Sequence, residues 1–307
     1  MMSFRLTSLK LTLSILGLII YLFIFGSVTY AWVTMSQINN IDNLTLIASM
    51  GQELLISTDG KTYSTSLSIH DLQLSHQLKD VTSLDGKTFQ RGGFHDLGDD
   101  VSNEDYISFD LYFKSTAREH DLFLVNRTFD ESERGTKVES QGVSFIPKVH
   151  YTEENHTLIE KDSRITYYAK DALRISFGEL DDNNQLGEVV IYDPSENEGR
   201  GYGKPFGAYS YYIARTNASL PLPIEHPDTI YQLSMMDPYN PYQALDNLSL
   251  MGELKPTNTY DLNGNMIYQT KIRFHLWIEG WDPDAIDGIL EDTLSIQLEF
   301  KLAHRAR

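Results

Sequence analysis

Alternation of apolar and polar residues is the dominant pattern in the chain beyond about residue 40. It is clearest in three runs, 107–113, 266–278 and 294–302; in the last of these every even-numbered residue is Leu, Ile or Phe and every odd-numbered one is polar. Such alternation is typical of a β-strand with one buried face. Weaker runs predict further strands at 44–48, 52–57, 121–126, 143–150, 164–168, 172–177, 187–192 and 207–214.

Turn signals separate these runs, at Asp59-Gly60, Asp85-Gly86, residues 181–184 and Asn263-Gly264. One short helix is predicted from Asp282 to about residue 292, with Asp282 as the N-cap, Pro283 in the first helical position and apolar residues at helical spacing. Residues 217–259 are rich in Pro, Asn and Tyr and are interpreted as a long irregular segment. No internal repeat is recognised.

Strands with one apolar face need a second sheet to cover that face. The pattern therefore predicts an all-β fold, a two-sheet antiparallel β-sandwich over residues 32–307 with an irregular insertion at about 217–259. Jelly-roll and immunoglobulin-like topologies both fit this pattern.

A long apolar segment precedes the strands. No charged residue lies between Lys10 and Asp42, and residues 11–33 are almost wholly apolar. Two interpretations stay open. A signal peptidase cleaves the chain between Ala31 and Trp32, or residues 11–33 remain as a membrane anchor. Both place the rest of the chain outside the cytoplasm, secreted or at the cell surface, because the basic residues precede the apolar segment.

Charge and cysteine content exclude several classes of protein. The 307 residues include 25 Lys and Arg against 43 Asp and Glu, a formal charge of −18, so nucleic acid is a poor partner. The chain has no Cys, which excludes disulfides, thiolate metal sites and a cysteine nucleophile. Its 41% hydrophobic content is sufficient for a large core.

The sequence contains none of the H-E-x-x-H, G-x-S-x-G or S-x-x-K catalytic patterns, and residues 199–205 (GRGYGKP) lack P-loop spacing and are interpreted as a glycine-rich turn. We therefore predict a non-enzymatic protein without a cofactor; a hydrolase with an unrecognised carboxylate pair remains an alternative. Two oxygen-rich stretches are calcium candidates, although plain turns are the preferred interpretation of both: Asp99, Asp100, Glu104 and Asp105 in one, and Asp261, Asn263 and Asn265 in the other.

The middle of the chain is rich in aromatic residues. Exposed rings, with Tyr209 and Tyr211 as the candidates, would suit a sugar or a protein partner, whereas the preferred interpretation places alternate rings in the core. Trp277 falls on the polar side of its strand, and we expect the short helix to cover it.

Residues 29–33 (TYAWV) resemble the end of the SipW-type signal peptide of the TasA and camelysin-like exported proteins of Gram-positive bacteria. Segments 78–89, 105–116, 171–177, 189–197 and 275–289 look like uncharacterised clostridial exported proteins that carry this signal. The resemblance implies a jelly-roll fold and a structural role in a biofilm matrix or at the cell surface, with copies of itself or related matrix proteins as partners. It also implies donor-strand assembly through residues 32–56. The alternative function is a membrane-anchored adhesin or glycan-binding module.

Overall fold

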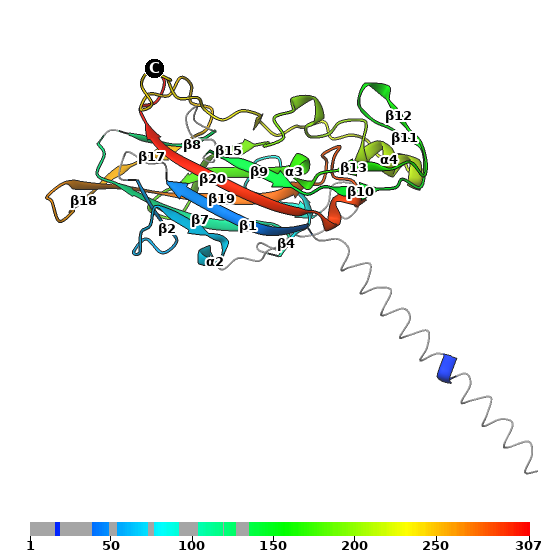
Figure 1. The fold of residues 1–307 in the computed structure, drawn as a ribbon, viewed down its shortest axis with the longest axis horizontal. Coiled ribbons are helices and arrows are strands. Elements are labelled where there is room, and N and C mark those ends of the chain that lie inside the picture. The colour runs from blue at the N-terminus through cyan, green and yellow to red at the C-terminus, as the bar shows by residue number, and fades with distance from the viewer. Residues whose placement is uncertain are drawn as a thin grey trace, which may run out of the picture. The chain divides into compact units, whose positions relative to one another are not determined.

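Two large β-sheets hold most of the strands (Figure 1). The computed structural model describes residues 16–18, 39–48, 54–72, 77–91, 104–118, 120–126 and 135–307. In sheet A the spatial order is β17 (Leu250–Glu253), β8 (Asp121–Val125), β20 (Thr293–Ala303), β1 (Asn39–Ala48) and β3 (Ser66–Ser68), with β4 (Gln77–Leu78) beside β1 and β9 (Lys137–Ser140) beside β20.

Sheet B is built around β19 (Met266–Glu279), the longest strand described. Its order is β16 (Thr229–Ile230), β15 (Leu186–Tyr192), β14 (Leu173–Leu180), β19, β5 (Asp80–Thr82) and β6 (Gln90–Arg91); β7 (Ile107–Ser115) and β18 (Lys255–Tyr260) also pair with β19, and β2 (Leu55–Ser57) pairs with β7. Two small hairpins pair β10 (Val143–Phe145) with β13 (Ile165–Tyr167) and β11 (Tyr151–Thr152) with β12 (Leu158–Ile159).

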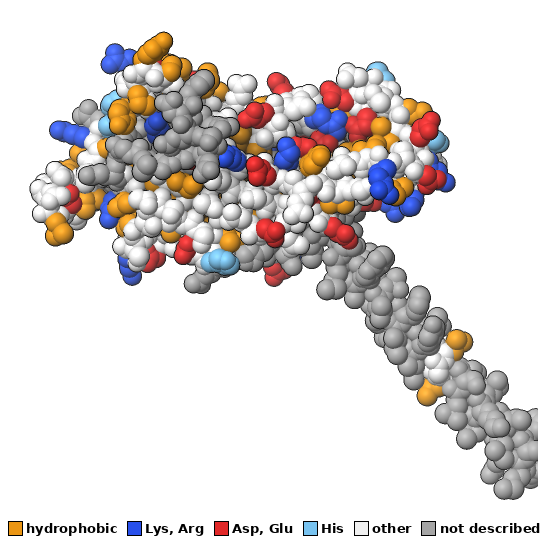
Figure 2. Space-filling view, viewed as in Figure 1, with side chains coloured by type: hydrophobic (Ala, Val, Ile, Leu, Met, Phe, Trp, Pro, Cys, Tyr) orange, Lys and Arg blue, Asp and Glu red, His pale blue; other side chains and the backbone are white. Residues whose placement is uncertain are grey.

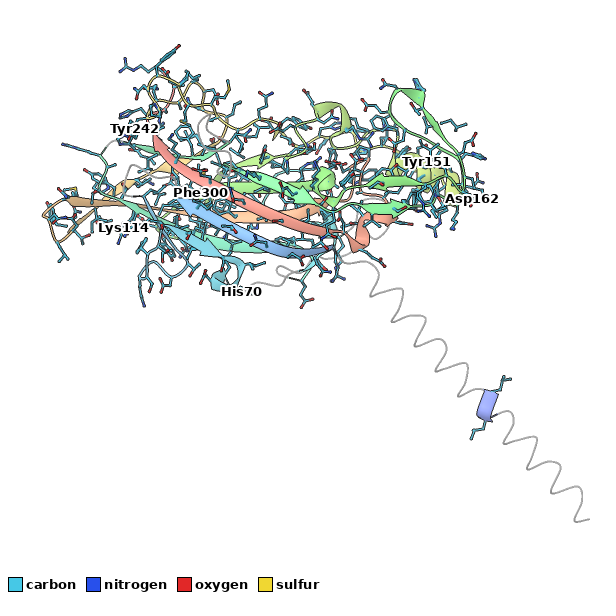
Figure 3. The ribbon with its side chains drawn as sticks, in the orientation of Figure 1. His70, Lys114, Tyr151, Asp162, Tyr242 and Phe300 are labelled. Carbon is cyan, nitrogen blue, oxygen red and sulfur yellow. The ribbon has the colours of Figure 1, made fainter. Side chains whose placement is uncertain are left out.

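The apolar faces of the two sheets share one core. Strands β7, β19 and β20 confirm the three clearest predictions, and their alternation appears as alternating burial along β7. Phe300 of β20, labelled in Figure 3, contacts Phe113 of β7 and Phe274 of β19. The ring centroids are 4.9 and 5.7 Å from that of Phe300, respectively. These rings join sheet A to sheet B, and residues 39–307 form one compact unit around this core.

The pairing is mixed, whereas an antiparallel arrangement was predicted. β1 runs parallel to β20 from Asn40 opposite Thr293 to Ala48 opposite Phe300, and the pairs β15–β16 and β5–β19 are also parallel. Only short hairpin connections force neighbouring strands to be antiparallel. β1 and β20 come from opposite ends of the chain, so no such connection constrains them.

Three predictions of secondary structure differ from the structure. The segment 217–259, interpreted as irregular, contains β16, β17 and most of β18. Residues predicted as a strand at 207–214 form α4 (Ala208–Thr216), which ends at Asn217 in the left-handed conformation. The prediction failed because a short apolar run fits both the two-residue period of a strand and the 3.6-residue period of a helix. The helix predicted from Asp282 is only a 3₁₀ turn, η3 (Asp287–Glu291). The remaining helical turns are α2 (Ile69–Leu72), α3 (Ala169–Ala172), η1 (Glu154–His156) and η2 (Glu198–Arg200).

The predicted turns at Asp59-Gly60 and Asp85-Gly86 are two copies of one structure. Residues 57–62 and 83–88 both read S-x-D-G-K-T, so the expectation of no internal repeat is wrong for this short motif. In each copy the Ser hydroxyl accepts the Gly N–H at 2.9 Å, and the Asp carboxylate accepts the next two N–H groups at 2.7–2.8 Å. The second copy lies against sheet B, where a Cβ on Gly86 would be 2.9 Å from Cβ of Ser176.

The segment that contains this second turn also covers Trp277. Trp277 is fully buried in a small cluster with Val81, Phe89, Tyr106 and Ile191. The Phe89 ring meets it edge-on, at 5.2 Å between centroids. The prediction that the short helix after Asp282 covers this side chain is therefore wrong, because residues 81–89 fold over that face of the sheet.

Candidate functional site

The two most unusual sequence segments, the glycine-rich residues 199–207 and the loop 279–285 after β19, meet in space. Gly203 N–H donates to the Trp281 carbonyl at 2.9 Å, and Ala208 N–H donates to the Pro283 carbonyl at 2.8 Å. A Cβ at Gly207, whose φ is +62°, would lie 2.3 Å from the Pro283 oxygen. Glycine is therefore required here for close backbone approach.

Arg174 of β14 lies beneath this loop and is 2% exposed. Its Nη2 lies 2.8 Å from Oδ2 of Asp193 and also bonds Oδ2 of Asp282, while Nη1 donates to the Leu173 carbonyl at 2.9 Å. Burial raises the pKa of both Asp193 and Asp282, and the positive charge of Arg174 opposes that change. The negative charges of these two carboxyl groups are therefore compensated by the same guanidinium, that of Arg174.

Arg200 of η2 makes a second set of ion pairs. Its guanidinium binds Asp284 through two bonds, 3.0 Å from Nε and 2.6 Å from Nη2, and its Nη1 lies 2.8 Å from Glu153. Glu153 also accepts from the Tyr167 hydroxyl, which lies 2.5 Å from the Tyr151 hydroxyl. Tyr151 lies at the end of the fold that carries the small hairpins (Figure 3).

Glu279, at the end of β19, completes the cluster and is 1% exposed. It accepts the Trp277 indole N–H at 3.0 Å and the Trp281 backbone N–H at 3.1 Å, and burial raises its pKa. We call the whole set the arginine network: Tyr151, Glu153, Tyr167, Arg174, Asp193, Arg200, Glu279, Asp282 and Asp284.

Each carboxyl group of the arginine network is engaged by described donors. The network ties β14, the end of β15, the end of β19 and the hairpin β11–β12 together. Its chemistry is therefore that of charge compensation inside the fold, which holds the small hairpins against the end of sheet B.

The first calcium candidate is only partly within the described residues. Asp99 and Asp100 lie outside them, and Glu104 is exposed. Asp105 is fully buried, with one carboxylate oxygen 2.6 Å from Lys79 Nζ and the other 2.8 Å from Arg91 Nε. Two cationic side chains therefore already compensate this carboxylate.

The second calcium candidate lies at the tip of the β18–β19 hairpin. The Asp261 carboxylate accepts the backbone N–H groups of Asn263 and Asn265 at 2.9 and 2.7 Å, and the bond from Asn265 lowers the pKa of Asp261 most. This is the geometry of the turn that the sequence also suggested. Within the described ranges, no group of three or more His, Asp or Glu side chains could hold a metal ion.

Neither of the two aromatic candidates for ligand contact is well exposed, in agreement with the preferred interpretation that the rings lie in the core. Tyr211 of α4 is 4% exposed and packs against Phe145 and Tyr151, and Tyr209 is partly buried with its hydroxyl on the Leu220 carbonyl. By contrast, Tyr239 is 96% exposed. Tyr239 belongs to the loop 235–248, which lies beside the end of the chain. The exposed apolar side chains of this loop form what we call the C-terminal patch: Met235, Tyr239, Tyr242, Leu245 and Leu248.

The backbone under the C-terminal patch is ordered by the end of the chain. Ala244 N–H donates to the His304 carbonyl at 2.9 Å, and His304 N–H donates to the Tyr242 carbonyl at 2.8 Å. Figure 2 shows hydrophobic side chains at the surface near this end of the fold, where Figure 3 labels Tyr242. The patch therefore presents rings and aliphatic groups to solvent from a fixed loop.

The predicted cleavage site, Ala31 and Trp32, lies outside the described residues, as does the apolar segment 11–33 apart from the helical residues 16–18. Among the described residues, no helix has the length and apolar character needed to cross a membrane.

Sequence reasoning missed the arginine network. A signal was present, because Arg174 interrupts the apolar run 172–177 and Glu279 stands between Trp277 and Trp281. A charge in such a position is costly unless it is paired. Its partners, however, lie far away in sequence. Comparisons of the chain with protein-family models, curated proteins and solved structures give no match.

Proposed function

We propose that the protein is an exported, non-enzymatic structural component of a cell surface or extracellular matrix. In this proposal residues 32–307 form a jelly-roll-like β-sandwich that assembles with copies of itself or related matrix proteins by donor-strand addition. The position of β1 supports this proposal most strongly.

β1 is the first strand after the apolar segment, and it lies inside sheet A rather than at its edge. It lies beside β20 (Figure 1) and pairs with it along most of its length, and on its other side it pairs with β3 and β4. Its side chains Ile41, Leu44 and Leu46 are at most 1% exposed. If β1 were removed from sheet A, the backbone edge of β20 would be exposed. The apolar slot in the core that the side chains of β1 fill would be exposed as well.

An empty slot of this kind is energetically costly. Burying an aliphatic side chain contributes about 1.5–3 kcal/mol, so the three apolar residues together represent about 5 kcal/mol or more. The N-terminal strand of a second copy would restore the same contacts and backbone hydrogen bonds. A chain in which β1 lies close to its own end can therefore exchange it between copies at little cost in contacts.

Cysteine cross-linking tests strand donation directly, because the chain has no native cysteine. Thr45 of β1 lies opposite Gln297 of β20, and paired positions on neighbouring strands are close enough for a disulfide. We would mix the single variants Thr45→Cys and Gln297→Cys of residues 32–307, concentrate and oxidise them, and examine the products by non-reducing electrophoresis.

Donation predicts disulfide-linked dimers in the mixture that neither variant forms alone. The double variant Thr45→Cys/Gln297→Cys is the matched control, because it closes the bond within one chain whenever β1 occupies its own sheet. Efficient closure in the double variant with no linkage in the mixture would contradict donor-strand assembly.

A second candidate function is surface adhesion or glycan binding through the C-terminal patch. The observation that favours it is the exposure of Tyr239 and Tyr242 on an ordered loop, since aromatic rings stack on sugars and anchor protein partners. Binding to a glycan array that is lost in Tyr239→Ala/Tyr242→Ala would support this function. Unchanged binding in that variant would remove the patch as its site.

A further inference from the structure

The C-terminal patch lies at the end of sheet A where β1 ends. Because β1 and β20 are parallel, Ala48 at the end of β1 is opposite Phe300, and His304 follows four residues later. The backbone of His304 is hydrogen-bonded to Tyr242 and Ala244 in the loop that carries the patch. Strand residues rise about 3.3 Å each and neighbouring strands lie about 5 Å apart, so this loop is within roughly 25 Å of Ala48.

The patch remains open to solvent in a single copy of the fold. All five of its side chains are at least 40% exposed. The bonds between the loop and the end of β20 hold its backbone, so the side chains stay at the surface. Apolar groups that cluster on an ordered surface typically mark a site of interaction with another molecule.

Strand donation brings a second copy to this same end of the fold. Residues 49–53 connect Ala48 to Leu54, which directly precedes β2. These six steps along the chain reach at most about 22 Å. When β1 of one copy fills the slot of another, Leu54 of the donor is therefore within about 22 Å of the end of that slot. The donor copy then lies at the end of the acceptor that carries the C-terminal patch.

The donor brings exposed apolar groups of its own to this contact. A row of paired residues crosses β2, β7, β19 and β18 of sheet B: Leu55, Lys114, Gln269 and Lys255. The β18–β19 hairpin extends beyond this row in the direction in which the chain leads back from β2 to residue 54, and Figure 1 shows β18 extending past its neighbours. At the hairpin tip Tyr260 is 60% exposed and Leu262 is fully exposed.

We propose that the C-terminal patch of an accepting copy is covered by the copy that donates β1. This inference rests on the proposed strand donation and names the surface that makes donation favourable. A strand that moves between identical copies forms the same contacts in both states, so the exchange alone does not favour assembly. A contact on the patch exists only between copies, and its burial of apolar surface favours the assembled state.

The test uses the mixture of Thr45→Cys and Gln297→Cys chains, with Tyr239→Ser/Leu245→Ser added to both. We would measure the protein concentration at which half of the chains become linked by a disulfide. That concentration should rise at least roughly tenfold, because the loss of one buried apolar side chain weakens association by about this factor or more. Met235→Ser/Leu248→Ser, at two other patch residues, should have a similar effect.

The matched control is Ile224→Ser. Ile224 is an apolar residue outside the patch and is 95% exposed, so its replacement should leave the concentration for half linkage unchanged. The patch substitutions are also placed in the double variant Thr45→Cys/Gln297→Cys. Closure of the disulfide within that chain as efficiently as without them shows that the fold and the slot for β1 are intact.

Unchanged linkage in both patch variants would overturn the proposal and leave strand donation supported. An equal loss in Ile224→Ser would overturn it as well, because the effect would then not belong to the patch. Unchanged linkage together with glycan binding that is lost in Tyr239→Ala/Tyr242→Ala would assign the patch to a sugar instead. Absence of linked dimers from the mixture without patch substitutions would contradict strand donation itself and this proposal with it.

Discussion

At the scale of single residues, Arg174 is the most deeply buried Lys or Arg among those described, and it compensates two carboxyl groups at once. Arg174→Met removes the charge but keeps much of the side-chain volume. We expect a loss of about 3–5 kcal/mol in the free energy of unfolding, because Asp193 and Asp282 are left buried without a cation. Denaturant unfolding at pH 7 measures this loss.

The matched control is Arg215→Met. Arg215 pairs with Asp287 at 2.5 Å, but the two side chains are 52% and 37% exposed. Exposed pairs contribute about 1 kcal/mol or less. Equal losses in the two variants would show that the arginine network is no more important to stability than a surface ion pair.

His275 predicts a pH dependence of stability. It is 6% exposed, the rings of Phe89 and Tyr106 meet it edge-on, and its Nδ1 has no partner among the described residues. Burial, with a smaller effect from Arg273, lowers its pKa from 6.5 to about 4, against the opposing charges of Asp110 and Asp85. The folded state therefore keeps His275 neutral where the unfolded chain already binds a proton.

Between pH 6.5 and 4 this difference should lower the free energy of unfolding by about 3 kcal/mol as the pH falls. His275→Gln should flatten that part of the pH profile, as measured by urea unfolding at a series of pH values. His156→Asn, at an exposed position with a φ of +58°, should keep the wild-type slope. A His275→Gln profile as steep as that of wild type would assign the slope to other groups.

At the scale of elements, strands such as β20 were predictable because their alternation is long enough to exclude a helix. The same reasoning failed for α4, where Tyr and Ala occur on successive positions and the run is too short to define a period. Asp282 has the residue type of an N-cap, but its carboxylate binds Arg174 and accepts the Asp284 N–H. A tertiary ion pair thus overrides the local helix signal.

Features that depend on distant parts of the chain could not be predicted from the local pattern of apolar and polar residues. The parallel register of β1 on β20 and the meeting of segments 199–207 and 279–285 depend on contacts between distant parts of the chain. Tyr211 and Tyr239 have the same side chain, yet one is buried and the other exposed. Residue type therefore indicated which side chains could contact a ligand. Only the fold shows which of those side chains are exposed.

At the scale of the whole molecule, charge opposes the assembly that β1 would support. Without residues 1–31 the chain has 23 basic and 43 acidic side chains, a formal charge of −20. Like charges on neighbouring copies repel over roughly 30 Å at about 0.01 M salt but only about 8 Å at 0.15 M. Assembly of residues 32–307 at pH 7 should therefore increase strongly between these two salt concentrations.

Sedimentation and negative-stain electron microscopy of concentrated protein measure this effect, and mild acidification at low salt should act in the same direction by neutralising carboxylates. The oxidised Thr45→Cys/Gln297→Cys variant is the matched control, because its own β1 is fixed in its own sheet; it should stay monomeric until the disulfide is reduced. Regular fibres from the reduced but not the oxidised variant would tie assembly to strand donation. Monomers under every condition would show that weaker repulsion between copies does not lead to assembly. That result would instead favour the binding function of the C-terminal patch.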